Sequence, residues 1–129
     1  MPYAATLISS DLDYGKQVTE HLKASGFPFK GSFWLYDESA DDWRLVVVTE
    51  LVDQVGRRDT YLRLGPIVDR VPGSDLHLFK ITVMSPETPL YQALAAAFGK
   101  TDNVEGMRLP RKVVKGVRVP DAYLYEINN

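Results

Sequence analysis

The sequence predicts an α+β fold, in which a mixed, largely antiparallel sheet of about five strands with a central hairpin is flanked by three helices. Two aromatic and β-branched runs within residues 31–49 enclose a short acidic turn, which is typical of a β-hairpin. Other segments carry apolar residues at the three- and four-residue spacing of helices. The chain has 129 residues and no long linker, so residues 1–129 are predicted to form a single domain with the order α-β-β-α-β-α-β-β.

The first helix is predicted over residues 9–26. Ser10 and Asp13 have the spacing of a capping box, although Asp replaces the usual Glu or Gln. One apolar row with four-residue spacing follows: Tyr14, Val18 and Leu22. Gly26 stands where a helix ends in the left-handed conformation.

The hairpin is predicted to join a strand that begins at Gly31 to a second strand over residues 43–49, through an acidic turn at residues 37–42. Side chains alternate along a strand, so the first strand divides its large side chains between two faces: Phe33 and Leu35 on one, Trp34 and Tyr36 on the other. Residues 45–48 are apolar without alternation, which is typical of a strand covered on both faces. The second strand is therefore expected to be central in the sheet.

A second helix is predicted over residues 53–71, and Gly65-Pro66 is expected to kink or split it. After a Pro-Gly-Ser break at residues 72–74, residues 76–84 alternate as a strand. His77 falls on the more apolar side of this predicted strand.

The third helix is predicted over residues 90–98, because cap residues and Pro89 precede it and Gly99 stops it. Residues 107–127 then contain β-branched runs. Three breaks interrupt these runs: Pro110, Lys115-Gly116 and Pro120. The segment is predicted to form two or three short strands near a sheet edge.

Composition excludes several classes of protein. Cysteine is absent, which removes disulfides, thiolate catalysis and cysteine-based metal sites. No apolar run is long enough for a membrane span, and the first residues lack the basic region of a secretory signal, so a cytoplasmic location is expected. The net charge of −2 hides an asymmetry: residues 1–53 carry four Lys/Arg against nine Asp/Glu, and residues 54–129 carry eleven against eight.

Several aromatic and aliphatic motifs are shared with a known group of proteins. They are residues 33–37, 42–46, 51–53, Gly56, Tyr61 and residues 115–125. On these motifs, which cover most of the chain after residue 30, the sequence resembles a group of small uncharacterised bacterial proteins. The resemblance implies a compact bacterial α+β domain, and it implies no activity and no site residues.

No residue pattern assembles a recognisable catalytic or metal site. Neither a Gly-x-Ser-x-Gly elbow nor a Gly-rich phosphate loop occurs. The carboxylates of the turn at residues 37–42 lack the spacing of a calcium loop and indicate a solvated turn. His21 is interpreted as a boundary residue of its helix and His77 as a hydrogen-bonded core residue. We therefore predict no catalytic residue, no metal site and no cofactor.

The element order also invites comparison with restriction-endonuclease-like domains. Such domains need an acid on one strand and an acid-x-Lys motif on the next. Glu50 is a candidate for the first acid, but Leu78 stands where the acid before Lys80 is needed. The predicted nuclease site is incomplete, and a degenerate or nucleic-acid-associated relative stays as an alternative.

Two sets of residues are candidates for binding. The aromatic set is Trp34, Tyr36 and Trp43, because aromatic side chains are enriched at protein interfaces, although packing in the core is the alternative. The basic set is Arg108, Arg111, Lys112 and Lys115, because cations on exposed strands can contact an anion or a nucleic acid, although they also protect sheet edges.

The sequence thus predicts a non-catalytic binding or protein-interaction module. Its expected partner is another protein chain or a second copy in a homodimer, with nucleic acid less favoured and no membrane. A degenerate restriction-endonuclease-like domain and a small-molecule binder with an apolar pocket between helix and sheet are the alternatives.

Overall fold

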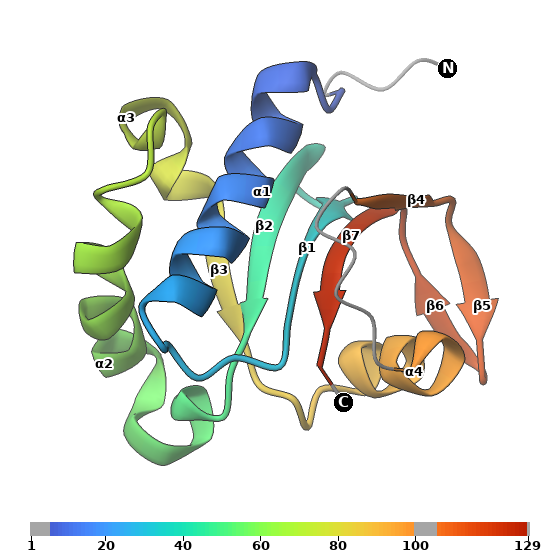
Figure 1. Ribbon diagram of the computed structural model, residues 1–129. Helices are drawn as coiled ribbons and strands as arrows, with labels where there is room; N and C mark the ends of the chain where they lie inside the picture. Colours follow the sequence, from blue (N-terminus) through green and yellow to red (C-terminus); the bar gives the residue numbers. More distant parts are fainter. Residues whose placement is uncertain (1–5, 100–105, 129) are drawn as a thin grey trace.

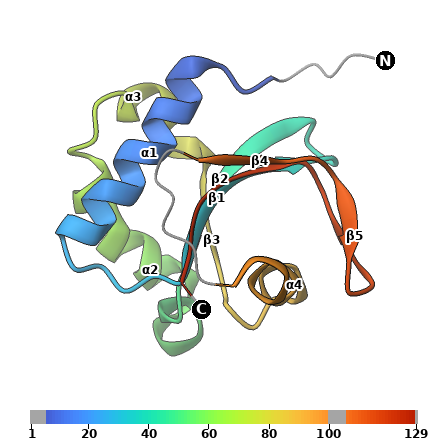
Figure 2. The ribbon, with the colours of Figure 1, turned by 45° about the vertical axis from the view of Figure 1, so that its right-hand side comes forward.

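The computed structural model describes residues 6–99 and 106–128. Its helices are α1 (Ser9–Ala24), α2 (Leu51–Val68), α3 (Ser74–His77) and α4 (Pro89–Phe98), with a 3-10 turn at Leu78–Lys80. Its strands are β1 (Gly31–Asp37), β2 (Asp42–Val48), β3 (Ile81–Met84), β4 (Met107–Leu109), β5 (Lys112–Val114), β6 (Val117–Val119) and β7 (Ala122–Ile127). A curved sheet separates α1, α2 and α3 on one face from α4 on the other (Figures 1 and 2). The predicted α+β class is confirmed.

The main sheet has five strands in the order β3-β2-β1-β7-β4, and β5 pairs with β6 in a separate two-stranded sheet. β1 pairs antiparallel with both β2 and β7, and β4 pairs antiparallel with β7. β2 and β3 run parallel, because α2 and α3 form the crossover between them. The predicted mixed, largely antiparallel sheet is confirmed, and β2 is an interior strand as expected.

Two core layers lie on the two faces of the sheet. Trp34 and Tyr36 belong to the layer under α1 and α2, whereas Phe33 belongs to the layer under α4. The alternation predicted for β1 is therefore confirmed. β2 contributes to both layers, with Leu45 on the α1 side and Val46 on the α4 side, as expected for a strand covered on both faces.

The apolar row predicted for α1 is buried, and Gly26 has the left-handed φ of 71° expected of a helix stop. The predicted cap is wrong in its residues. The N–H of Ile8 donates to Asp11 Oδ2 at 3.0 Å, whereas Asp13 accepts a hydrogen bond from Gln17 on the exposed side of the helix. Asp11 thus stabilises the start of α1, where backbone N–H groups lack helical partners.

The break in α2 lies at a different position from the predicted one. Gly56 has φ 86° and ψ 168°, a backbone conformation that costs glycine little and other residues much. The helix then continues through Pro66, and the N–H of Asp69 donates to the carbonyl of Gly65 at 2.9 Å. The kink predicted at Gly65-Pro66 is therefore wrong.

The strand predicted over residues 76–84 is present only at its end, because residues 74–80 form α3 and the 3-10 turn. Side-chain bonds to the backbone favour this local helix. Ser74 Oγ donates to the carbonyl of Val71 at 2.9 Å, and His77 Nδ1 lies 3.0 Å from the carbonyl oxygen of Gly73.

The C-terminal segment forms four strands, one or two more than predicted. Its breaks lie where expected: Pro110, Pro120 and the turn at Lys115-Gly116, where φ is 50° and 77° as a two-residue hairpin turn requires. The expected edge position is wrong for β7, which lies between β1 and β4. The interior position follows from its sequence, because four consecutive residues from Leu124 to Ile127 are buried.

The outer edge of β3 is closed by side chains from α2. The backbone N–H of Val83 donates a hydrogen bond to Tyr61 Oη at 3.1 Å. The Arg57 guanidinium donates to the carbonyl of the same residue. Both outward-facing backbone groups of Val83 are therefore satisfied within the molecule.

α4 forms as predicted, with Pro89 in the first turn and Gly99 at φ 62° after the last. Leu94 and Tyr91 anchor it in the core. Although α4 is the most apolar helix, neither it nor any other described helix is long and apolar enough to cross a membrane.

Candidate functional site

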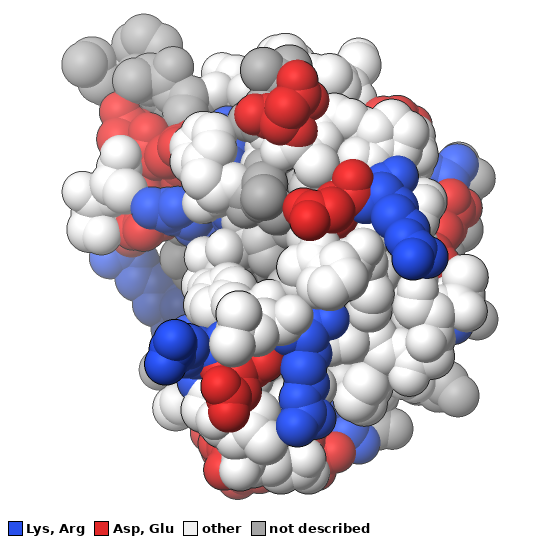
Figure 3. Space-filling model, turned by 90° about the vertical axis from the view of Figure 1, so that its left-hand side faces the viewer, with Lys and Arg blue, Asp and Glu red and all other residues white. Residues whose placement is uncertain are grey.

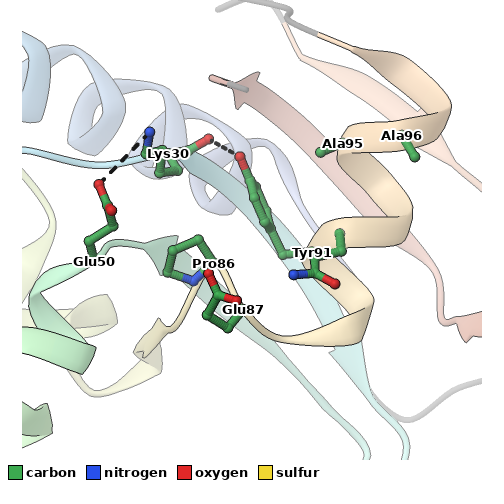
Figure 4. Close-up of a pocket in the computed structure, with 8 residues that line it drawn as sticks. Lys30, Glu50, Pro86, Glu87, Tyr91, Ala95 and Ala96 are labelled. Carbon is green, nitrogen blue, oxygen red and sulfur yellow. Dashed lines mark hydrogen bonds and ion pairs between the residues drawn. The ribbon is translucent and has the colours of Figure 1, made fainter.

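A polar cleft lies at the end of the sheet where β2, β3 and β7 finish and β1 begins (Figure 4). One hollow of about 370 Å³ is lined by Lys30, Glu50, Pro86, Glu87, Tyr91, Gln92, Ala95 and Ala96. A second hollow of about 300 Å³ shares two of them and is lined by Pro28, Phe29, Lys30, Glu50 and Asn128. Ligands of sheets with parallel strands commonly bind outside the carboxyl ends of those strands, which makes this cleft the main candidate site.

The backbone of Lys30 is held firmly at the centre of the cleft. Its N–H donates to the carbonyl of Val48 at 2.6 Å, and its carbonyl accepts from the N–H of Asn128 at 2.6 Å. The same carbonyl accepts from the Tyr91 hydroxyl at 3.0 Å (Figure 4). These bonds join β1, β2, β7 and α4, so only the side chain of Lys30 is left to move.

The wall formed by the loops after β2 and β3 is also held in place. Thr49 Oγ1 donates to the carbonyl of Pro28 at 2.7 Å. Ser85 Oγ donates to the Asp53 carboxylate, with distances of 2.9 and 2.7 Å to its two oxygens, and accepts from the N–H of Glu87 at 3.0 Å. The β3–α4 loop is thereby tied to α2, so the protein's own hydrogen bonds hold this wall of the cleft.

Gly31, which follows Lys30, permits a close approach of Tyr91 in α4 and of β7 beside the cleft. A Cβ atom at this position would lie 3.1 Å from the carbonyl oxygen of Glu126 and 3.3 Å from Tyr91 Cε1. Both distances are shorter than ordinary van der Waals contacts. A larger residue would therefore push α4 away from β1 and β7.

Opposite charges face each other across the cleft. Lys30 Nζ lies 3.8 Å from Glu50 Oε1, and the two side chains are 42% and 59% exposed. An exposed pair at this distance contributes at most about 1 kcal/mol, so a ligand can replace it at small cost. Glu87 and Gln92 add an exposed carboxylate and an exposed amide to the same hollow.

Tyr91 has a positioning role in the cleft. Burial raises the pKa of its phenol, which therefore stays protonated at neutral pH and continues to donate to the carbonyl of Lys30. Its ring packs under α4 and is 5% exposed.

The predicted aromatic binding residues are buried. Trp34 is fully buried, and its indole N–H donates to the carbonyl of Asp11 at 3.1 Å and to Tyr125 Oη at 3.2 Å. Tyr36 and Trp43 are 7% and 4% exposed, with ring centroids 5.5 Å apart in an edge-to-face arrangement. All three occupy the core position that was the alternative to a contact surface.

The predicted basic residues lie together at the C-terminal strands, away from the polar cleft. Arg108 stacks over the Trp43 ring at 5.3 Å and lies 3.8 Å from Asp121. Arg111, Lys112 and Lys115 are exposed, and their side chains have no ion-pair partner among the described residues.

The acid and the lysine of the nuclease comparison do not meet. Lys80 precedes β3 and lies 3.7 Å from Asp42 at the start of β2, whereas Glu50 follows the end of β2. Since β2 and β3 are parallel, the two residues are at opposite ends of the sheet. In the described part of the chain, no group of three His, Asp or Glu side chains is placed to hold a metal ion.

His77 is a buried, hydrogen-bonded residue, as its sequence interpretation predicts. Its Nε2 lies 2.9 Å from Asp11 Oδ1, its Nδ1 lies 3.0 Å from the carbonyl of Gly73, and its ring stacks on Tyr14 at 4.7 Å. Tyr14 in turn shares a hydrogen bond with Ser74 at 3.1 Å. This network joins α1 to α3 and leaves His77 without access to the cleft.

The charge difference between the two halves of the chain does not produce a surface of one sign over α2 and α3. Acidic and basic side chains are interspersed on this face (Figure 3). α2 itself carries exposed charges of both signs: Asp53, Arg57, Arg58, Asp59 and Arg63. Fields from such neighbours largely cancel at a distance.

Comparisons with protein-family models, curated proteins and solved structures found no match to this chain. The resemblance to small uncharacterised bacterial proteins therefore stays a prediction. The cleft is interpreted from its own residues.

Sequence reasoning missed the cleft. Lys30, Glu50, Tyr91 and Asn128 come from four distant parts of the chain, and each is an ordinary residue in its own segment. The parallel pairing of β2 and β3, whose carboxyl ends border the cleft, was not predicted from the sequence, so no signal marked this end of the sheet.

Proposed function

We propose that the protein is a binding domain whose polar cleft takes a small molecule carrying both an anionic and a cationic group, such as a free amino acid. The observation that carries the proposal is the meeting of two hollows at Lys30 and Glu50. Their volumes of about 370 and 300 Å³ fall at the lower end of the range for small-ligand sites.

Charge placement favours a ligand with both signs. The ligand's carboxylate would bind the Lys30 ammonium, and its ammonium group would bind Glu50 and Glu87 on the opposite wall. The weak ion pair between Lys30 and Glu50 would then be exchanged for contacts of both side chains with the ligand, and Glu87 would add a second carboxylate beside the ligand's ammonium group.

The rigid scaffold supports binding without chemistry. The hydrogen bonds of Lys30, Thr49 and Ser85 hold both walls in one arrangement, which reduces the entropy lost when a ligand binds. The hydroxyl of Tyr91 donates to the backbone and is thereby engaged in positioning.

Titration of the labelled protein with free amino acids, followed by NMR, tests the proposal. Acetate and ethylamine serve as probes that carry one of the two charges. We expect an amino acid to shift the amide signals of Lys30, Glu87 and Asn128. Each single-charge probe should need at least a tenfold higher concentration to produce the same shifts. Lys30→Met should abolish the shifts, and the exposed Lys112→Met should leave them unchanged. Equal shifts with acetate alone, or none with any amino acid, would contradict the proposal.

We also propose a cytoplasmic location, which is the expectation from the sequence. Fractionation of cells that express the tagged chain would test it.

A further inference from the structure

A second concave surface lies on the α4 side of the sheet, which we call the sheet groove. It has a volume of about 500 Å³ and its floor includes Leu35, Arg44, Val46, Thr82 and Met84. These residues belong to β1, β2 and β3, and no residue of α4 lines the groove. The groove is therefore the part of this sheet face that α4 leaves open.

One end of the sheet groove is acidic. Asp37 and Glu38 line it, and Asp41 is exposed in the same turn. Asp37 and Asp41 have no ion-pair partner in the described part of the chain. A hydrogen bond from Ser39 is the main cause that lowers the pKa of Asp37, so this carboxylate keeps its negative charge at mildly acidic pH.

The β5–β6 hairpin carries the complementary chemistry. Arg111, Lys112 and Lys115 are exposed and unpaired within the described residues, and residues 106–120 contain no acid. Between these cations lies Val113, an apolar side chain that is 67% exposed. The hairpin thus presents an apolar residue surrounded by positive charge.

The acidic turn and the basic hairpin are neighbours within one molecule. Arg118 of β6 donates to Glu38 Oε2 at 2.8 Å. Figure 2 shows β5 curving away from the main sheet beyond β4. Because the two charged regions adjoin each other, a two-fold rotation can place the acidic turn of each copy against the basic hairpin of the other.

We infer that this face is a homodimer interface, in which the β5–β6 hairpin of each copy docks on the sheet groove of the other. Val113 contacts the apolar side chains of the floor, which are Leu35, Val46 and Met84. Lys112 and Arg111 pair with the acidic turn. The contact is isologous, so each dimer contains it twice. This inference uses a surface separate from the polar cleft, and its outcome does not depend on the proposed ligand.

Charge complementarity favours a second copy over nucleic acid. A phosphate backbone that approached the basic hairpin would also meet the carboxylates of Glu38 and Asp37 beside it, and like charges repel. A second copy presents both signs, and each meets its opposite.

Sedimentation equilibrium at low and high salt tests the inference on the full chain. We expect a dimer at low salt whose dissociation constant rises at least tenfold at high salt, because exposed charges are screened. R111E/K112E and E38K/A40K alter exposed positions, and each should give a folded monomer. Val113→Ser should weaken the dimer without changing the salt dependence. Circular dichroism establishes that each variant is folded.

A charge-exchange experiment identifies the pairing. Mixing R111E/K112E with E38K/A40K restores complementary charges at both contacts, so the mixture should form a heterodimer although each variant alone is monomeric. Monomeric wild-type protein at low salt would overturn the inference. Dimers formed by either charge-reversed variant alone, R111E/K112E or E38K/A40K, would overturn it as well. Failure of the mixture to associate would overturn the assigned pairing. Binding of an oligonucleotide by monomeric wild-type protein would assign the hairpin to nucleic acid instead.

Discussion

The two faces of the sheet are built differently. On the α1 side, three helices cover the strands, and the polar groups there are joined in a network that includes Asp11, His77 and Trp34. On the α4 side, one helix covers part of the face, and hollows remain at its margins. We call the first the closed face, although a hollow of about 210 Å³ remains there between α2 and β3, and the second the open face. We expect the closed face to contribute more to stability.

The largest expected difference in the free energy of unfolding comes from two leucines, one on each face. Leu45 is fully buried on the closed face, whereas Leu35 is half-buried at the open groove. We expect Leu45→Ala to lower the free energy of unfolding by about 3–4 kcal/mol, and Leu35→Ala by about 1 kcal/mol. Urea denaturation of both variants measures the two values. Equal losses would show that the open face contributes as much as the closed one.

The polar network is tested by two aspartates of α1. Asp11 is buried, accepts a hydrogen bond from the N–H of Ile8 and lies 2.9 Å from His77 Nε2, whereas Asp13 is exposed and accepts a hydrogen bond from Gln17. Asp11→Ala should cost roughly 2–3 kcal/mol, because it leaves buried donors without a partner. Asp13→Ala should stay within about 0.5 kcal/mol. An ordinary hydrogen bond contributes about 1 kcal/mol. A smaller loss for Asp11→Ala would show that the network does not contribute to the stability of this face.

Alkaline pH should lower the free energy of unfolding by a smaller amount, through a tyrosine of the closed face. Burial is the main cause that raises the pKa of Tyr125 above the ordinary tyrosine value of 10.0. The folded state therefore keeps this proton where the unfolded state loses it. Stability is complete below pH 10 and falls as pH rises above it, by about 1.4 kcal/mol per pH unit for one such group.

Tyr125→Phe is the variant that checks this pH dependence. Phenylalanine does not ionise, so its free energy of unfolding should fall less steeply above pH 10 than that of the wild-type protein. At neutral pH the same variant should be less stable, because the hydroxyl bonds the carbonyl of Leu12 at 2.6 Å. Parallel slopes for the two proteins would exclude Tyr125 as the source.

Much of the fold could be predicted from local pattern. Alternation in β1 assigned Phe33 and Trp34 to opposite faces, and Pro89 with Gly99 marked the ends of α4, because these signals depend on the backbone nearby. The strand predicted over residues 76–80 was wrong because His77 and Asp11, which are far apart in sequence, fix a local helix there.

The sites depend still more on distant residues. Trp34, Tyr36 and Trp43 have the chemistry of contact residues, but α1 and its neighbours cover them, which no single segment reveals. Lys30 and Glu50 face each other only because β1 and β2 are neighbouring antiparallel strands. Residue type predicts what a side chain can do, and tertiary structure decides whether it is exposed to do it.

The closed border of β3 limits the size of any assembly. A strand from another molecule would have to displace both Arg57 and Tyr61 before it could pair with Val83. Growth of the sheet from this side into a fibre is thereby hindered. In the dimer that we propose, the contacts made through the hairpins would be complete once two copies have met, so that assembly would have a finite size.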